Sequence, residues 1–229
     1  MLKLPESLKN IKVDIKRKKI KSIILKVNKT TEELQISLPE GVPLTLVENM
    51  IVRKEKWILE NFSKVKIIKK NRLEYKTGDV LNIFEKKFLL VVMENDRDSI
   101  LFKDNKLYVF TKYPNDREHK KDIVNYWYRE QGKTILGDIL KTYLQITKKR
   151  INKFTIKTLK RNWGSCEVYK KNINLNSELL KQNRKFAEYV VLHEIAHLEH
   201  PNHSKNFYDY VAKFMPDWKV RSKLGRIES

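Results

Sequence analysis

Short stretches of alternating apolar and polar residues, separated by turn residues, fill the first part of the chain. This alternation predicts strands over residues 11–16, 20–28 and 34–38, arranged as an antiparallel meander with a basic hairpin at 16–19. From residue 44 to about residue 66 the apolar positions recur at helical spacing instead. This pattern predicts one amphipathic helix packed on the sheet.

Alternation resumes after Gly78 and predicts strands over residues 80–84, 87–93, 99–103 and 106–110. A long helical region follows from Pro114 to about Thr147, and residues 153–160 alternate again. A turn at 170–172 predicts a short β-hairpin directly before the next helix. The expected fold class is α+β. An antiparallel β-rich N-terminal region with one helix covers residues 1–112, and a helical domain with the hairpin covers residues 113–229.

Histidine is concentrated in one window of this second region. Four of the five histidines lie between His193 and His203. On a helix, His193 and His197 project from the same face and can each bind one ion at about 2 Å, while Glu194 can reach a water on that ion. Three protein ligands and one open position are typical of catalytic zinc. The apolar flanks predict a buried helix, where histidines and a glutamate without partners would be costly.

Two histidines compete for the third ligand position. Pro201 disfavours the α conformation at the residue before it, which predicts that the helix ends near His200. His203 follows that turn, six residues after His197, and this separation matches the long zinc-protease motif. We favour His203 as the ligand and expect His200 beside the site or on the surface. Glu199 is a weaker rival.

Composition narrows the class of protein. The chain has 229 residues, 41% of them hydrophobic, and no apolar run approaches the roughly 18 residues of a membrane span. The N-terminus does not resemble a secretory signal. The single cysteine, Cys166, excludes an internal disulfide and fits a reducing compartment, so we expect a cytoplasmic protein. We interpret Cys166 as a buried thiol rather than a nucleophile or metal ligand.

The formal net charge of +21 is the second large signal. Such a balance attracts polyanions, and nucleic acid is therefore a possible partner. The alternative is a lysine-rich composition spread over the whole surface, and the sequence leaves both open.

Three blocks carry a family resemblance: Trp163-Gly164-Ser165-Cys166, then Ile173-Asn174-Leu175-Asn176, then the run from Tyr189 to Leu198 that continues through Asn202-His203 to Phe207. With these blocks the sequence resembles the YgjP-like metallopeptidase family, related to the WLM and SprT-like zinc proteases. The resemblance covers roughly residues 150–225 with specific motifs and the first half in layout only. It implies a zincin-like fold for the second region.

Carried onto this sequence, the resemblance implies one Zn²⁺ held by His193, His197 and His203, with Glu194 as general base. There are two departures. Asn162 stands where the family usually has arginine before the tryptophan, with Arg161 adjacent, and Tyr208 stands where many relatives have tryptophan. We expect the second to be a packing change.

We therefore predict a zinc-dependent hydrolase, favouring a metallopeptidase in which Glu194 activates a zinc-bound water. The candidate substrate-binding strand is Trp163-Gly164-Ser165-Cys166, and His200, Tyr208 and Arg221 are candidate oxyanion donors. The resemblance to these families also suggests two alternative functions, a nucleoside triphosphate pyrophosphatase and a protease acting on DNA-bound proteins. A nucleic-acid-binding protein with a structural zinc is a third class, disfavoured because structural zinc usually has four protein ligands.

Overall fold

The computed structural model describes residues 2–29, 31–70, 72–159 and 161–225, and the chain divides into two units, Met1–Leu73 and Glu74–Ser229. The predicted division between residues 112 and 113 falls inside the second unit. A helix that follows this point packs on the preceding sheet, so the two segments share contacts. A functional division there stays a prediction.

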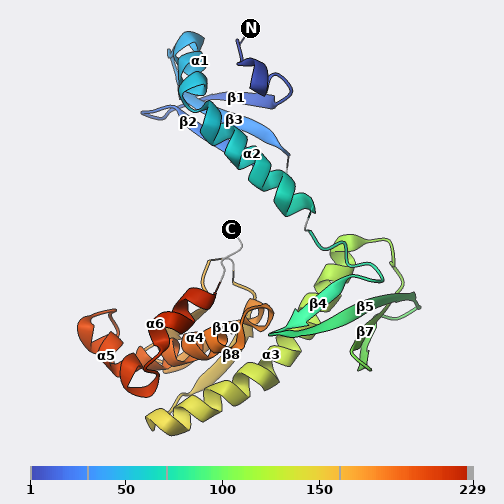
Figure 1. The fold of residues 1–229 in the computed structure, drawn as a ribbon, viewed down its shortest axis with the longest axis vertical. Helices are drawn as coiled ribbons and strands as arrows, with labels where there is room; N and C mark the ends of the chain where they lie inside the picture. Colours follow the sequence, from blue (N-terminus) through green and yellow to red (C-terminus); the bar gives the residue numbers. More distant parts are fainter. Residues whose placement is uncertain (1, 30, 71, 160, 226–229) are drawn as a thin grey trace. The chain divides into compact units, whose positions relative to one another are not determined.

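A three-stranded sheet built around its central strand forms the first unit (Figure 1). The strands are β1 (Lys12–Lys18), β2 (Ile24–Asn28) and β3 (Glu33–Pro39), in the order β1-β3-β2. Leu34, Ile36 and Leu38 of β3 are almost fully buried, whereas β1 and β2 contain exposed positions. The strand with the most apolar inner face therefore lies in the middle.

The predicted antiparallel meander is wrong in this unit. β1 pairs with β3 in parallel and β2 pairs with β3 antiparallel, so β1 and β2 are not hydrogen-bonded neighbours. The basic segment 16–19 consequently forms no hairpin between them. The single predicted helix is also two helices, α1 (Leu44–Arg53) and α2 (Glu55–Lys70), separated at Lys54. Ile51 of α1 and Ile58 of α2 both reach the same buried cluster as β3.

The second unit contains two sheets and the helices that carry the histidine window. Its first sheet is formed by β4 (Val80–Ile83), β5 (Lys86–Glu94), β6 (Ser99–Lys103) and β7 (Lys106–Thr111), in the order β4-β5-β7-β6. The four strands were predicted from their alternation. Their pairing was predicted only in part, because β4–β5 and β6–β7 are antiparallel whereas β5 and β7 run parallel.

A helix of 31 residues, α3 (Arg117–Thr147), links this sheet to the second one (Figure 1). Asp116 caps its first turn by accepting a hydrogen bond from the His119 backbone N–H at 3.0 Å. Trp127 packs against Phe88 and Phe102 of the first sheet, and Gly132 allows Ile156 of the second sheet to approach closely. The predicted long helix to Thr147 is confirmed.

The second sheet precedes the helix that carries the motif. It consists of β8 (Lys153–Lys157), β9 (Gly164–Glu167) and β10 (Asn172–Asn176), with β10 in the centre and β9 at an edge. β9 and β10 form the predicted hairpin, and β8 ends at Lys157, before the predicted limit at residue 160, which lies outside the described residues. The 3₁₀ turn η2 (Ser177–Lys181), α4 (Arg184–Ala196), α5 (Lys205–Phe214), α6 (Trp218–Arg221) and the turn η3 (Ser222–Leu224) follow. The α+β fold class is confirmed.

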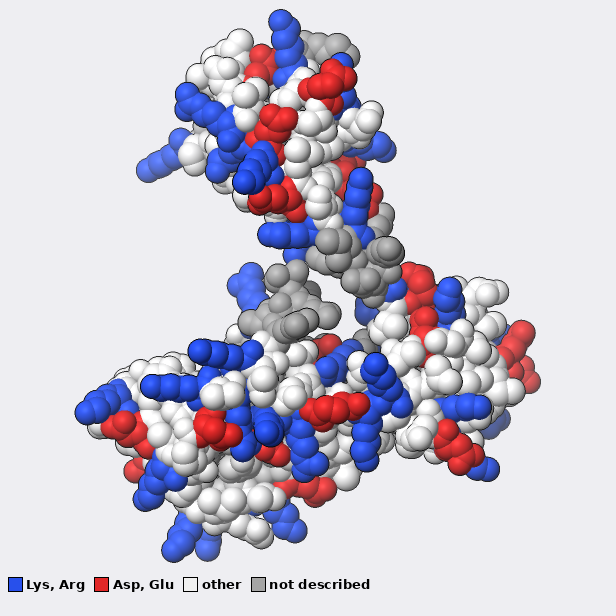
Figure 2. Space-filling view, in the orientation of Figure 1, with Lys and Arg blue, Asp and Glu red and all other residues white. Residues whose placement is uncertain are grey.

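Basic side chains are dispersed over the surface in view. Figure 2 shows lysines and arginines on both units, with acidic side chains between them. On this face they do not gather into one uninterrupted patch. In the described part of the chain, no helix combines the length and the apolarity needed to cross a membrane.

In the sheet β4-β5-β7-β6, the alternation of buried and exposed residues predicts which leucines stabilise its packing on α3. Leu107 is fully buried and lies opposite Phe102, which contacts Trp127, whereas Leu101 lies on the other face and is 50% exposed. We expect Leu107→Ala to lower the free energy of unfolding by about 2–5 kcal/mol, because it removes buried methyl groups and leaves a cavity. Leu101→Ala is the matched control and should cost less than about 1 kcal/mol by urea denaturation. Equal losses in the two variants would contradict the assigned faces.

Candidate metal centre

The motif helix α4 is a mainly buried segment with a well-formed start. Asn183 caps it by accepting a hydrogen bond from the Lys185 backbone N–H at 2.9 Å. Val191, Leu192, Ile195 and Ala196 are fully buried, and this fixes the rotation of the helix about its axis. His193 and His197 therefore lie one turn apart on the same side, with ring centroids 4.9 Å apart.

The helix ends earlier than the position of Pro201 suggested. The last α-helical residue is Ala196, and His197 occupies the C-cap with helical backbone angles. The next residues continue as hydrogen-bonded turns, in which the N–H groups of Glu199 and His200 donate to the Ala196 carbonyl. The chain then turns back through residues 201–204 to α5, and this return carries His203 to the other two histidines.

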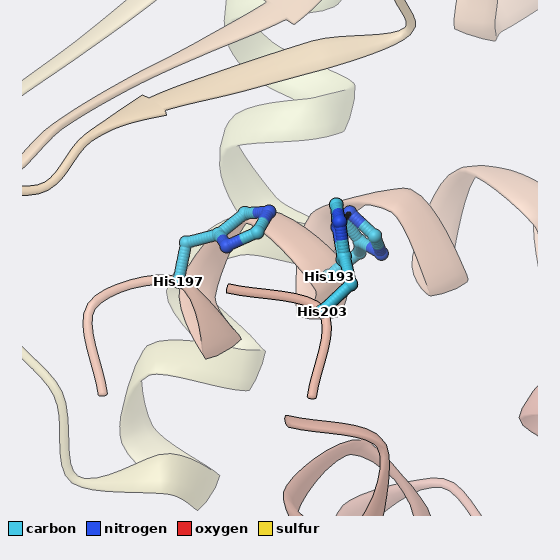
Figure 3. A group of neighbouring side chains, drawn as sticks. All are labelled: His193, His197 and His203. Carbon is cyan, nitrogen blue, oxygen red and sulfur yellow. Dashed lines mark hydrogen bonds between the residues drawn. The ribbon is translucent and has the colours of Figure 1, made fainter. Parts of the chain in front are cut away.

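The structure brings the three predicted ligands together. One nitrogen of each of His193, His197 and His203 lies within 4.8 Å of the others. Figure 3 shows the three rings turned toward a common region, His193 from α4, His197 from the C-cap that follows it and His203 from the loop beyond. The Nε2 atoms of His193 and His203 are 3.0 Å apart. Two nitrogens bound tetrahedrally to one zinc ion lie about 3.3 Å apart, so this pair is already close to the spacing of ligands.

An aromatic ring from α5 packs against all three imidazoles. Phe207 is fully buried, and its ring centroid lies 4.8–4.9 Å from those of all three histidines. The sequence identified Phe207 only as part of an apolar helix face. Its contact with all three rings depends on how α5 packs on α4, which the helical periodicity of α5 alone does not specify.

Contacts at the far nitrogens orient two of the rings. The Nδ1–H of His197 donates to the His200 backbone carbonyl at 3.2 Å, which leaves Nε2 available as the ligand atom. The Tyr189 hydroxyl lies 3.4 Å from Nδ1 of His193. The sequence analysis named Tyr189 only as the start of a motif block and gave it no role, although it stands four residues before His193 and hence on the same helix face.

The protonation states also suit a metal. Burial, with smaller contributions from His197 and His203, lowers the pKa of His193 to about 3. Burial likewise lowers the pKa of His197. Neutral imidazole is the form that binds metal. Two partly buried neutral rings beside the exposed His203 therefore fit a divalent cation with nitrogen ligands.

Glu194 lies in contact with the edge strand β9. It is 6% exposed, and burial raises the pKa of its carboxyl group to about 8. A Cβ atom at position 164 would lie 2.7 Å from both Cγ and Oε1 of Glu194. The backbone of β9 can therefore approach the carboxyl group only because residue 164 is glycine.

A cleft of about 550 Å³ opens over the three histidines and Glu194. All four residues of the predicted substrate strand line it: Trp163, Gly164, Ser165 and Cys166. The cleft also contains Arg161, for which the sequence suggested no role beyond its place beside Asn162. Burial, followed by the charge of Glu194, raises the pKa of Cys166 to about 11, so its thiol stays protonated at neutral pH. This agrees with an unreactive thiol, although Cys166 is only partly buried.

The candidate oxyanion donors lie around the site and not along the cleft. The carbonyl of His200 contacts His197, while its ring packs against Tyr210. Tyr208 is stacked between His203 and Trp218. Arg221 is paired with Glu188 and Asp217, so its guanidinium is already occupied. Glu199, the weaker ligand candidate, is paired with Lys149.

A protein-family model described as a YgjP-like metallopeptidase domain matches residues 21–224. The chain belongs to the YgjP-like metallopeptidase family. The family predicted from the motifs is thus confirmed, and the match extends through most of the first unit, where the sequence showed a likeness in layout only. Membership of the YgjP-like family supports a metal-dependent hydrolase that acts on peptides. It lends no support to a nucleotide or nucleic-acid partner, and the cytoplasmic location stays a prediction.

Solved structures of two metallopeptidase zymogens are similar to part of this YgjP-like chain. One is jannalysin of Methanocaldococcus jannaschii, with 20% identity and a TM-score of 0.34, covering 38% of this chain and 93% of that one. The other is abylysin of Pyrococcus abyssi, with 24% identity and a TM-score of 0.35, covering 40% and 97%. A search of curated proteins found no match.

Burial of Glu194 predicts that its removal stabilises the metal-free protein. Its folded-state pKa of about 8 lies above the ordinary value of 4.5, so ionisation destabilises the fold as pH rises through that interval. We expect Glu194→Gln to raise the free energy of unfolding by an amount that is small near pH 4.5, grows up to about pH 8 and reaches the order of 5 kcal/mol. Urea denaturation of chelator-treated protein across this range measures the difference. A gain independent of pH would contradict the assignment.

Proposed function

We propose that this YgjP-like protein is a zinc-dependent peptidase in which His193, His197 and His203 hold one Zn²⁺ and Glu194 transfers protons. The observation that supports this most directly is that Glu194 lies against the edge strand β9 and lines the same cleft as the three histidines. Zinc held by three imidazoles supplies a Lewis acid that lowers the pKa of a coordinated water to near 7 and polarises a carbonyl.

The chain's own residues supply the remaining functions. Glu194 accepts the proton of the attacking water and passes it to the nitrogen of the leaving amine. The nearly complete burial of its carboxyl group favours this shuttle, because a raised pKa brings the acid and base forms close in energy at neutral pH. Phe207 packs against the three imidazoles and limits their movement.

The edge strand provides a place for an extended substrate. β9 pairs with β10 on one side, and no strand of the described chain pairs with its other side. A peptide can add to this free edge through backbone hydrogen bonds, which would align its scissile bond along the cleft. Because Gly164 lies against Glu194, such a peptide would lie close to the proton-transferring carboxyl group.

Metal dependence and proton transfer can be tested together. We expect zinc-loaded protein to cleave fluorogenic peptides, 1,10-phenanthroline to abolish cleavage and added Zn²⁺ to restore it. Glu194→Gln should lower kcat by about 10²–10⁴-fold with zinc content unchanged, because only the proton transfer is lost. His203→Ala should reduce the zinc content itself. Elemental analysis and peptide kinetics provide the two readouts.

Two outcomes would contradict the proposal. One is a Glu194→Gln protein that binds zinc and retains full activity. The other is release of pyrophosphate from nucleoside triphosphates, abolished by Glu194→Gln, in a protein that cleaves no peptide.

The contact between Gly164 and Glu194 gives a separate prediction. In Gly164→Ala the new Cβ would displace the carboxyl group, since the two cannot remain 2.7 Å apart. We expect kcat to fall about 10–100-fold, with KM and zinc content changed far less, because proton transfer depends on position. Gly137→Ala in α3 is the matched control, because its added Cβ would meet only Phe154 at 3.5 Å. It should leave kcat unchanged. Equal kinetics in the two variants would show that the contact has no catalytic role.

A further inference from the structure

The cleft has an uneven distribution of charge. Among the described residues, one charged side chain lines it apart from the histidines and Glu194, that of Arg161. The apolar part of the lining lies close by: the rings of Trp163 and Phe186 meet edge to face at 5.4 Å, and Tyr189 and Val190 continue the same wall. A positively charged group therefore adjoins an aromatic and aliphatic surface.

Arg161 lines the cleft and has no anionic partner among the described residues, unlike Arg184 and Arg221. Arg221 is bound to Glu188 and Asp217, and Arg184 also contacts Glu188. A guanidinium group binds carboxylates through a planar pair of N–H donors and is less strongly hydrated than an ammonium group. Because no described carboxylate binds the Arg161 guanidinium, this group is available to an anionic group of a bound substrate.

The loop that carries Arg161 is held at both ends by one buried side chain. Asn176 is 3% exposed, and its Nδ2 donates to the carbonyl groups of Leu159 at 2.8 Å and Asn162 at 2.9 Å. Its Oδ1 accepts from the Leu159 N–H at 3.3 Å, and its own backbone N–H donates to the Trp163 carbonyl at 2.8 Å. These bonds hold Leu159, Asn162 and Trp163 against β10. The backbone near Arg161 is therefore anchored at the cleft, which lowers the entropic cost of ordering this segment when a ligand binds.

We infer that Arg161 determines specificity by binding a substrate carboxylate, so that the cleft prefers peptide segments with an acidic side chain close to an apolar residue. This inference rests on the proposed peptidase function for its biological meaning, but binding can be measured without cleavage. It assigns to Arg161 recognition of the substrate and no part in the chemical step.

Binding tests the inference first. The probes are fluorescein-labelled decapeptides containing Leu and Phe, with Glu, Gln or Lys placed at each position in turn. Fluorescence anisotropy with the zinc-loaded Glu194→Gln protein, at about 0.15 M salt to screen distant charges, measures their affinity without turnover. We expect Glu at one or two neighbouring positions to improve affinity about fivefold to tenfold over Gln, as a charge-assisted hydrogen bond would.

Variants then assign the preference to one residue. Introduced alongside Glu194→Gln, Arg161→Gln should abolish the preference for Glu, and Arg161→Glu should reverse it in favour of Lys. Arg150→Gln is the matched control, since it removes the same charge from an exposed arginine outside the cleft. Zinc content and circular dichroism verify that each variant is folded.

The outcomes separate this inference from the proposed function. If no position prefers Glu, or if Arg150→Gln weakens the preference as much as Arg161→Gln does, the inference is wrong. In the second case the preference arises from the net charge of +21. If binding follows Arg161 as expected but the zinc-loaded wild-type protein cleaves none of the peptides, the inference stands and the peptidase proposal fails. Cleavage of neutral and acidic peptides with equal kcat/KM and equal affinity would support the peptidase and overturn the role of Arg161.

Discussion

The contact between the backbone of β9 and the carboxyl group of Glu194 connects every other part of the candidate site. It requires a residue without a side chain at position 164, a helix α4 whose rotation is fixed by buried residues, and a central strand β10 that holds β9 in place. Each requirement comes from a different segment of the chain. The site is consequently a property of the whole second unit, although its ligands lie in one short window.

Burial gives the site its chemical character and also makes it costly. The same low-polarity surroundings raise the pKa of Glu194 and lower those of His193 and His197. Burial disfavours the charged forms of these groups, so near neutral pH the ionised Glu194 lowers the stability of the fold unless a cation bound to the imidazoles attracts its carboxylate. The reactive site therefore lowers the stability of the metal-free fold, and metal binding would restore this stability.

The large positive charge of the chain has a limited bearing on the cleft. On the face shown in Figure 2, basic side chains are dispersed among acidic ones, and Lys149 and Arg221 near the site form ion pairs. Arg161 is different because it lines the cleft and has no carboxylate partner within the described residues. A single unpaired charge in a concave, partly apolar site influences recognition more than many solvated charges on an open surface do.

The sequence by itself determined the local elements and the histidine cluster. Strands and helices followed from apolar spacing of two and of three to four residues, and the spacing of His193 and His197, with the turn at Pro201, indicated a common ion site. Tertiary structure decided the order of the strands, including the parallel β1–β3 and β5–β7 pairs, and the separation of α1 from α2. It also placed Gly164 against the carboxyl group of Glu194 and Phe207 against the three imidazole rings. Arg221, a candidate oxyanion donor, is instead paired with Glu188. The spacing of apolar residues and of histidines involves only residues close together in the sequence. Strand order and these contacts depend on which distant apolar faces bury the most surface together, and that is settled only when the whole unit folds.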